Sequence, residues 1–255
     1  MKSPLIICSA CSIGTLFVLF SSCAAPSGGG NGNKTNLSSV TKDAPFVNSL
    51  GMKFVPVPGT NILMYTTETT VAQCRAAGLG NPAPQFAQGA NHPAVNINSY
   101  TAAKWCKWLS QVEGRKYRLP TDLEWSSAVG TSEYPWGSAW PPPNNCGNYA
   151  GQEMRGSTAA QRSLLYQGIN IVGGFSDRHI FTAPVGSYPA NSLGLHDLGG
   201  NVWELCSNQS VYGQIIRGGS WLSASRGNVA SSRVYNSDPV NHTINDNGFR
   251  VVVEL

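Results

Sequence analysis

Charged residues are scarce in this sequence of 255 residues, since Asp, Glu, Lys and Arg make up only 12% of it. A soluble globular protein usually contains about twice that share. Coiled coils and disordered polar chains need many more charges, so both classes are excluded. The formal net charge of +4 is too small to predict a nucleic-acid-binding surface. Seven Trp, nine Tyr and eight Phe instead supply the apolar surface of one sizeable core.

Metal-binding cysteine patterns are also missing from the chain after residue 23. No CxxC pair occurs there and the His residues are scattered, so a zinc site is not expected. Four cysteines remain in this part of the chain, and the sequence leaves every pairing among them open. They are Cys74, Cys106, Cys146 and Cys206.

The first 22 residues are predicted to be a signal peptide, because Lys2 is followed by an apolar run over residues 5–20. Small residues then lead to Cys23, in a pattern that resembles the lipobox of lipoproteins. The resemblance implies cleavage before Cys23 and lipidation of its thiol. Residues 23–45, which include a glycine-rich stretch, are expected to be a flexible tether. An uncleaved anchor helix is the alternative, although about 16 apolar residues are few for a membrane span.

The remaining residues, 46–255, are predicted to form one α+β domain with few helices and several short strands. Strands are expected over 52–57 and 62–66 as a hairpin, and later over 215–217 and 249–253. The last of these is nearly all apolar and is expected to lie centrally in a sheet.

Three helices are expected, over 71–77, over 101–112 and from Thr121 to a stop at Gly130. Thr121 and Glu124 have the spacing of a capping box. The buried face of the middle helix is predicted from helical spacing. It comprises Ala102, Trp105, Cys106, Leu109 and Val112. Residues 134–195 consist mostly of turn-forming residues, and such a long irregular stretch needs bound ions or buried aromatic side chains to order it.

A series of short motifs follows one another along the domain. They are 48–55 (NSLGMKFV), 118–125 (RLPTDLEW), 134–137 (YPWG), 182–186 (TAPVG), 194–204 (GLHDLGGNVWE), 217–221 (RGGSW) and 248–250 (GFR). In this order they resemble the formylglycine-generating-enzyme, or sulfatase-modifying factor, family. The resemblance covers about residues 48–253 and implies the family's loop-rich variant of the C-type lectin fold.

The same resemblance argues against the family's chemistry in this chain. Its enzymes oxidise a substrate cysteine with two catalytic cysteines that follow the Gly-Gly-Ser-Trp motif. Here the two positions hold Ser223 and Asn228, which can neither form a thiolate nor bind copper as soft ligands. We therefore expect no enzyme activity and no catalytic cofactor.

The resemblance further implies structural calcium, bound by hard oxygen ligands. One matching set consists of Asp197, Gly200, Val202 and Glu204. A second consists of Asn148 and Asp177 with the carbonyls of Tyr149 and His179. The alternative for Asp197 and Glu204 is capping and hydrogen bonding within a turn.

The segment between Trp221 and Gly248 lacks Lys, Glu, Gln, Met and Trp and contains many Asn residues. It resembles the variable region of proteins diversified by retroelements, in which asparagine codons are copied with errors at adenines. Substituting both adenines of an AAC codon reaches most residue types but none of those five. The segment 222–247 is therefore expected to be variable, on a framework that matches the family. The framework residues are Trp221, Ala230, Ser231, Ser232, Arg233, Pro239, Phe249 and Arg250.

The diversified side chains are expected to converge on one exposed face, where Tyr beside Ser, Asn and Arg is typical of a binding surface. They are Leu222, Ser223, Ala224, Arg226, Gly227, Asn228, Val234, Tyr235, Asn236, Ser237, Asp238, Val240, Asn241, His242, Thr243, Ile244, Asn245 and Asp246. The alternative is an ordinary solvated loop that drifted after catalysis was lost.

Three functions are compatible with these patterns. The first is a lipid-anchored protein of the cell envelope, exposed at the outer-membrane surface, which binds changing extracellular protein or cell-surface ligands. The second is a catalytically inactive structural or assembly lipoprotein of the envelope. The third and least favoured is an oxidase of the formylglycine-generating type. Nucleic acid is not an expected partner of any of them.

Overall fold

The computed structural model describes residues 36–79, 86, 89–157, 170–229, 236–238 and 243–255. Two small sheets and a few short helices give the predicted α+β class. The predicted signal peptide, Cys23 and most of the tether lie outside the described residues. No helix among the described residues is long and apolar enough to cross a membrane.

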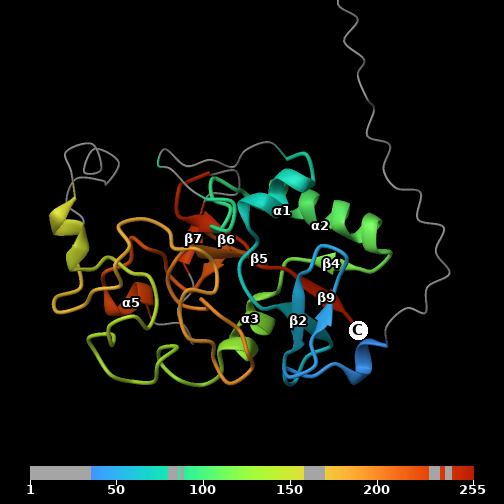
Figure 1. Ribbon diagram of the computed structural model, residues 1–255, viewed down its shortest axis with the longest axis horizontal. Coiled ribbons are helices and arrows are strands. Elements are labelled where there is room, and N and C mark those ends of the chain that lie inside the picture. The colour runs from blue at the N-terminus through green and yellow to red at the C-terminus, as the bar shows by residue number, and fades with distance from the viewer. Residues whose placement is uncertain (1–35, 80–85, 87–88, 158–169, 230–235, 239–242) are drawn as a thin grey trace, which may run out of the picture. The chain divides into compact units, whose positions relative to one another are not determined.

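The first sheet brings together the N-terminal strands of the domain and its C-terminal strand (Figure 1). Its strands run in the order β1-β2-β3-β9-β4, and every neighbouring pair is antiparallel. Their bounds are β1 Phe46–Val47, β2 Lys53–Pro56, β3 Ile62–Tyr65, β9 Val252–Glu254 and β4 Tyr117–Arg118. The predicted hairpin is confirmed by the β2–β3 register of Phe54 with Tyr65. The apolar C-terminal strand lies inside the sheet, as predicted.

Three helices match the predicted ones and begin at side-chain caps. They are α1 Val71–Ala76, α2 Ser99–Glu113 and α3 Asp122–Val129. The predicted capping box of α3 is confirmed, because Thr121 Oγ1 accepts from Glu124 N and Glu124 Oε2 accepts from Thr121 N. Helix α2 begins two residues earlier than predicted, since Asn98 caps it. Val112 was expected on its buried face but is 52% exposed, because it lies in the last turn beyond the core.

The second sheet carries the middle and the C-terminal end of the segment 222–247. Its order is β7-β6-β5-β8, and β5 pairs with β8 in parallel. The bounds are β7 Asn236–Asp238, β6 Gly213–Arg217, β5 Trp203–Ser210 and β8 Asn247–Gly248. Strand β6 contains the predicted strand 215–217. The strand predicted over 249–253 begins only at Val252, because the chain leaves the second sheet after Gly248 and buries Arg250 before it enters the first.

The main core lies between the first sheet and helices α1 and α2. Trp105 from α2 packs edge-on against Phe249 at a centroid distance of 5.6 Å. Leu37, in a short 3-10 helix over Leu37–Ser39, is also buried in this core. The folded part of the chain therefore begins before residue 46, which shortens the predicted tether.

Between α3 and β5 the described residues form almost no regular structure, as predicted; Figure 1 shows these green to orange loops at one end of the domain. Their only helical element is the 3-10 helix η2, Gln152–Gly156. Buried aromatic side chains order the loops, including Tyr134 stacked on Trp136 at 4.9 Å. Asn201, fully buried at φ 59°, links three segments, since its Oδ1 accepts from Ala183 N and Asn148 Nδ2 while its Nδ2 donates to Glu68 Oε1.

Candidate binding face

The start of the segment 222–247 is fixed by the Gly-Gly-Ser-Trp motif. Trp221 is fully buried and packs edge-on against Phe86 and Phe181, with centroid distances of 5.5 and 5.3 Å. Gly219 has φ +79°, and a Cβ there would lie 2.6 Å from the carbonyl oxygen of Asn228. Glycine at this position therefore lets the backbone of the segment 222–247 approach closely.

The end of the segment is fixed by the Gly-Phe-Arg motif. The guanidinium of Arg250 is fully buried and donates through Nε and Nη2 to the carboxylate of Glu204. It also donates to the carbonyl oxygens of Tyr65 and His196, at 3.1 and 2.7 Å. Both ends of the segment 222–247 are thus flanked by buried, hydrogen-bonded motifs.

Three of the residues expected on the exposed face are buried. Ser223 Oγ accepts from Ser220 N at 3.0 Å, and the Ser223 carbonyl accepts from Ala150 N at 3.1 Å. Asp246 Oδ2 accepts from Ser220 Oγ at 2.7 Å, while the Asn245 carbonyl accepts from Trp221 Nε1 at 3.3 Å. The expectation that Ser223, Asn245 and Asp246 are exposed is therefore wrong, because they join the two ends of the segment.

Other residues of the segment do present an accessible surface. The short helix α5, Arg226–Val229, exposes Arg226, Gly227 and Asn228 and buries Val229 among aromatic side chains. Arg226 lies over the ring of Trp140, with its Cζ 5.6 Å from the ring centroid, which is a cation–π contact. Thr243 is exposed, and Leu222, Ala224 and Ile244 are half-buried.

The rest of the predicted face is only partly described. Strand β7 pairs its backbone with β6 and forms an edge of the second sheet. Several predicted face and framework residues lie outside the described residues, and their contributions stay predictions. They are Val234, Tyr235, Val240, Asn241 and His242 of the face, and Ala230, Ser231, Ser232, Arg233 and Pro239 of the framework.

The four cysteines of the domain have little thiolate character. All four carry free thiols. Burial raises the pKa of Cys74, Cys106 and Cys146 to about 12, and burial also raises the pKa of Cys206 well above its usual value. At neutral pH these groups are thiols rather than the thiolates that thiol oxidation requires.

The first predicted calcium set is largely occupied by hydrogen bonds within the protein. Both oxygens of Glu204 accept from Arg250, and Oε2 also accepts from Trp125 Nε1. Asp197 Oδ2 accepts from Gly186 N, and its Oδ1 has no hydrogen-bond partner among the described residues. Gly200 and Val202 are buried beside them. This arrangement fits calcium poorly, and calcium at this set stays a prediction.

The second predicted set fits calcium better. Asn148 is fully buried, and its Oδ1 has no hydrogen-bond partner within the described ranges. Asp177 is also buried, with its two oxygens accepting from the backbone N–H groups of Tyr149 and His179 at 2.7 and 2.8 Å. Carboxylate oxygens have further lone pairs available. These residues would hold calcium with hard oxygen ligands, and the ion would join two loops.

One buried carboxyl pair was not expected from the sequence. Glu68 is fully buried and lies close enough to Asp197 for the two carboxyls to interact. Burial, reinforced by the Asp197 carboxyl, raises the pKa of Glu68 well above its usual range. The one clue in the sequence is a charged residue shortly after an apolar strand.

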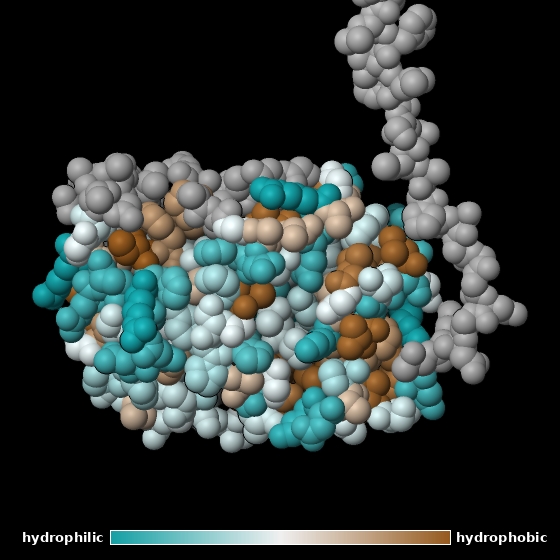
Figure 2. All heavy atoms as spheres, viewed as in Figure 1, coloured by the Kyte–Doolittle hydropathy of each residue, from teal (hydrophilic) through white to brown (hydrophobic). Residues whose placement is uncertain are grey.

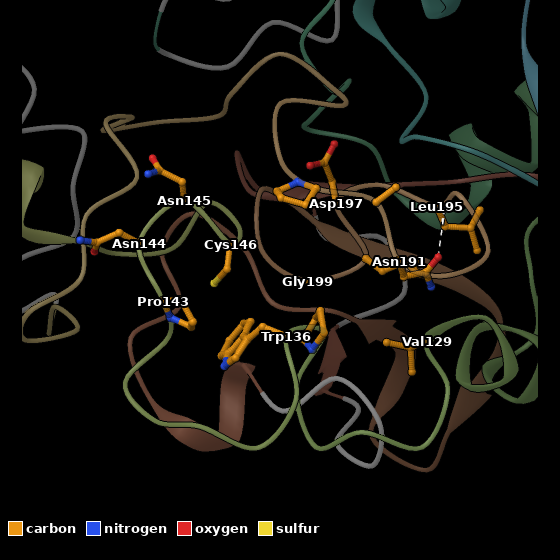
Figure 3. A pocket seen from close by; sticks show the side chains of 14 residues that line it. Val129, Trp136, Pro143, Asn144, Asn145, Cys146, Asn191, Leu195, Asp197 and Gly199 are labelled. Carbon is orange, nitrogen blue, oxygen red and sulfur yellow. Dashed lines mark hydrogen bonds between the residues drawn. The ribbon is translucent and has the colours of Figure 1, made fainter.

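A cavity of about 320 Å³ lies among the loops between α3 and β5. Figure 3 shows the side chains that line it. Its walls include Trp136, Pro143 and Cys146, together with Asn191. The Asp197 carboxylate points away from Trp136 and Cys146 (Figure 3). No described residue of the segment 222–247 lines the cavity.

The sequence of the domain matches a known family along almost all of its length. The profile of the sulfatase-modifying factor enzyme 1-like domain matches residues 36–255. The chain belongs to this family. The resemblance expected from the ordered motifs is therefore confirmed.

Relatives in the family include enzymes and proteins described as inactive. The chain is 32% identical over 124 residues to a formylglycine-generating enzyme of Streptomyces coelicolor, covering 46% of this chain and 32% of that protein. It is 31% identical over 145 residues to the inactive C-alpha-formylglycine-generating enzyme 2 of Mus musculus, covering 54% and 40%. The chain thus spans less than half the length of these relatives, and family membership alone does not assign an activity to it.

Solved structures confirm the fold. PvdO from Pseudomonas aeruginosa superimposes with a TM-score of 0.57 at 22% identity, covering 76% of this chain and 80% of PvdO. Treponema denticola variable protein 1 superimposes with a TM-score of 0.56 at 18% identity, covering 82% of this chain and 98% of that protein. The predicted formylglycine-generating-enzyme type of fold is therefore present, in a scaffold that a variable protein shares.

Proposed function

We propose that this chain is a non-catalytic, lipid-anchored protein of the cell envelope that binds extracellular protein or cell-surface ligands through the segment 222–247. One observation carries the proposal: the segment is anchored at both ends by buried motifs, yet exposes α5 between them. A fixed scaffold that presents changeable side chains is the usual arrangement of a diversified binding surface.

The two positions that match the family's catalytic cysteines support the non-catalytic part. Ser223 is buried and hydrogen-bonded to Ser220, and Asn228 is exposed on α5. Neither residue supplies a thiol, and the thiols at Cys74, Cys106 and Cys146 have pKa values raised by burial. Recognition in this proposal is therefore noncovalent.

The composition of the segment supports diversification by a retroelement. Its many Asn residues and its lack of Lys, Glu, Gln, Met and Trp match what adenine-directed errors in asparagine codons produce. The division into exposed and buried positions refines the proposal. We assign ligand contact to Leu222, Ala224, Arg226, Gly227, Asn228, Thr243 and Ile244, and a supporting role to Ser223, Asn245 and Asp246.

Two randomised libraries of the full chain test this division. The first randomises Leu222, Ala224, Arg226, Gly227 and Asn228, and the second randomises Ser223, Asn245 and Asp246. We expect most members of the first library to fold and to be displayed on the cell surface. Most members of the second should misfold and be missing from the surface. Equal loss from both libraries would contradict a tolerant binding face.

A peptide assay tests the absence of catalysis. The purified chain, with and without added copper, is incubated with a cysteine-containing sulfatase peptide, and oxidation is followed by mass spectrometry. We expect no aldehyde product. Any conversion above that of a heat-denatured control would overturn the proposal in favour of an oxidase.

A further inference from the structure

Behind the binding face, two carboxyl groups lie close together. Asp177 is 2% exposed, and Glu153 Oε2 accepts from Asp177 N at 3.4 Å. The carboxyls of Asp177 and Glu153 are near enough to each other to interact. Within the described parts of the chain, no ion pair involves either residue.

The Glu153 side chain is folded back toward the protein. Its Oε1 is buried and has no hydrogen-bond partner among the described residues. A Cβ on Gly151 would lie 2.1 Å from that oxygen, so only glycine at 151 leaves room for the carboxylate in this position. A solvated carboxylate on a 3-10 helix would normally turn outward to water.

Asn148 provides the independent third group. It is fully buried, and its Nδ2 donates to the Phe181 carbonyl at 2.8 Å and to Asn201 Oδ1 at 3.1 Å. These two bonds fix the orientation of the amide and leave Oδ1 without a partner in the described part of the chain. A buried polar atom left without a partner is costly unless a ligand satisfies it.

We propose that Glu153 is a calcium ligand, which completes a site with Asn148 and Asp177. The family resemblance implies only Asn148, Asp177 and two carbonyls, so the Glu153 carboxylate is the new element. Two carboxylates and an amide oxygen form a hard, negatively charged donor set suited to calcium. The ion would neutralise both carboxylates and join η2 to the loop that carries Asp177.

The site lies directly behind the binding face. Ala150, between Asn148 and Glu153, donates its N–H to the Ser223 carbonyl at 3.1 Å, and Trp221 donates its N–H to the Asn201 carbonyl at 3.0 Å. Calcium would therefore order the support of the exposed residues near α5. This last consequence rests on the proposed function, whereas calcium binding itself does not.

Isothermal titration of the metal-free full chain in detergent with calcium chloride tests the proposal. Glu153→Gln removes one charge from the site, and we expect calcium affinity to fall at least about tenfold, because ligand charge sets affinity. Gly151→Ala keeps both carboxylates but displaces Glu153, and we expect a fall in the same direction. The matched control is Glu113→Gln, in which the altered side chain accepts from Ser49 and lies outside the site.

Asp177→Asn is a harsher variant, because this carboxylate also holds two backbone N–H groups, so Glu153→Gln and Gly151→Ala decide the question. Weaker binding in both variants, with unchanged binding in Glu113→Gln, supports the site. The proposal is overturned if the unaltered chain binds no calcium at millimolar concentration, or if Glu153→Gln binds it as tightly as the unaltered chain does. Either result would leave the library test of the binding face unaffected.

Discussion

The guanidinium of Arg250 and the carboxylate of Glu204 form a fully buried ion pair that joins the last motif of the chain to strand β5. The Arg250 Nη2 to Glu204 Oε1 distance is 2.7 Å, and Trp125 Nε1 donates to the same carboxylate at 2.8 Å. Because the two charges are hydrogen-bonded to each other and to their surroundings, the pair fixes the point at which the chain passes from one sheet to the other. The segment 222–247 ends beside this pair, because Gly248 is the strand partner of Glu204.

Removing one partner of this pair should destabilise the domain strongly. In Arg250→Met the Glu204 carboxylate stays buried without its counter-charge, and we expect the free energy of unfolding to fall by about 3–5 kcal/mol. Urea denaturation followed by tryptophan fluorescence measures the change. Lys116→Met is the control, because Lys116 pairs with Glu254 at an exposed position and should cost at most about 1 kcal/mol. Equal losses in the two variants would show that the buried pair has no special structural role.

The free energy of unfolding should fall in acid, because the half-buried Arg118 then loses its two carboxylate partners, Glu254 and Glu124. Hydrogen bonds from Arg118 and Lys116 lower the pKa of Glu254. Burial opposes the same effect at Glu124, but hydrogen bonds from Arg118 and Thr121 prevail and lower its pKa. Folded pKa values below the unfolded value of about 4.5 contribute stability that is present above that pH and is lost as the pH falls through the folded values.

Denaturation of the unaltered chain and of Arg118→Met between about pH 7 and pH 3 measures this contribution. We expect the free energies of unfolding of the two proteins to converge as the pH falls below about 4.5. Protonated carboxyls no longer form ion pairs with Arg118, so its removal then costs little. A constant difference across the whole range would exclude these two carboxyls as its source.

The thiols of the folded domain should resist alkylation. Since burial raises the pKa of Cys74 and Cys106 to about 12, we expect iodoacetamide at about pH 8 to leave them unmodified until the chain unfolds. Cys146 is half-buried and lines the cavity of Figure 3, so it should react first, although slowly. Peptide mapping by mass spectrometry after timed labelling distinguishes the sites. Rapid labelling of both Cys74 and Cys106 in the folded chain would show that these groups are reactive thiolates, and would contradict the account.

Calcium should protect α5 from proteolysis if the site behind it binds the ion. Trypsin cleaves after Arg226, which is exposed on α5, and cleavage in a folded chain depends on local opening. We expect calcium to slow this cleavage several-fold in the unaltered chain and to have little effect in Glu153→Gln. Cleavage after Lys42, which lies outside α5 and outside the proposed calcium site, serves as the internal control. Protection that persists in Glu153→Gln would place the stabilising ion elsewhere.

Local sequence patterns predicted the parts of the fold that neighbouring residues determine. The capping box at Thr121 and the hairpin that pairs Phe54 with Tyr65 are examples, and the structure confirms both. The ordered motifs also identified the family. Figure 2 shows apolar side chains on the visible side as separate patches among polar ones.

Features that depend on tertiary contacts escaped prediction. Ser223 and Asp246 were expected to be exposed loop residues. The Ser223 carbonyl instead accepts from the distant Ala150 N, and Asp246 Oδ2 accepts from Ser220 Oγ, 26 residues earlier in the chain. Glu153 has an ordinary polar neighbourhood in the sequence, and only the fold brings it to Asp177. Spacing along the chain cannot show such contacts between distant loops.

The central claim is that the segment 222–247 is diversified for binding, and the DNA of the locus tests it most directly. Sequencing a few kilobases downstream should reveal a near-copy of the codons for these residues beside a reverse-transcriptase gene, with differences only where the copy has adenine. The substitutable codons should include those of Leu222, Arg226 and Asn228. If no copy exists and the segment does not vary between isolates, the claim is contradicted, and a non-catalytic structural lipoprotein of the envelope takes its place.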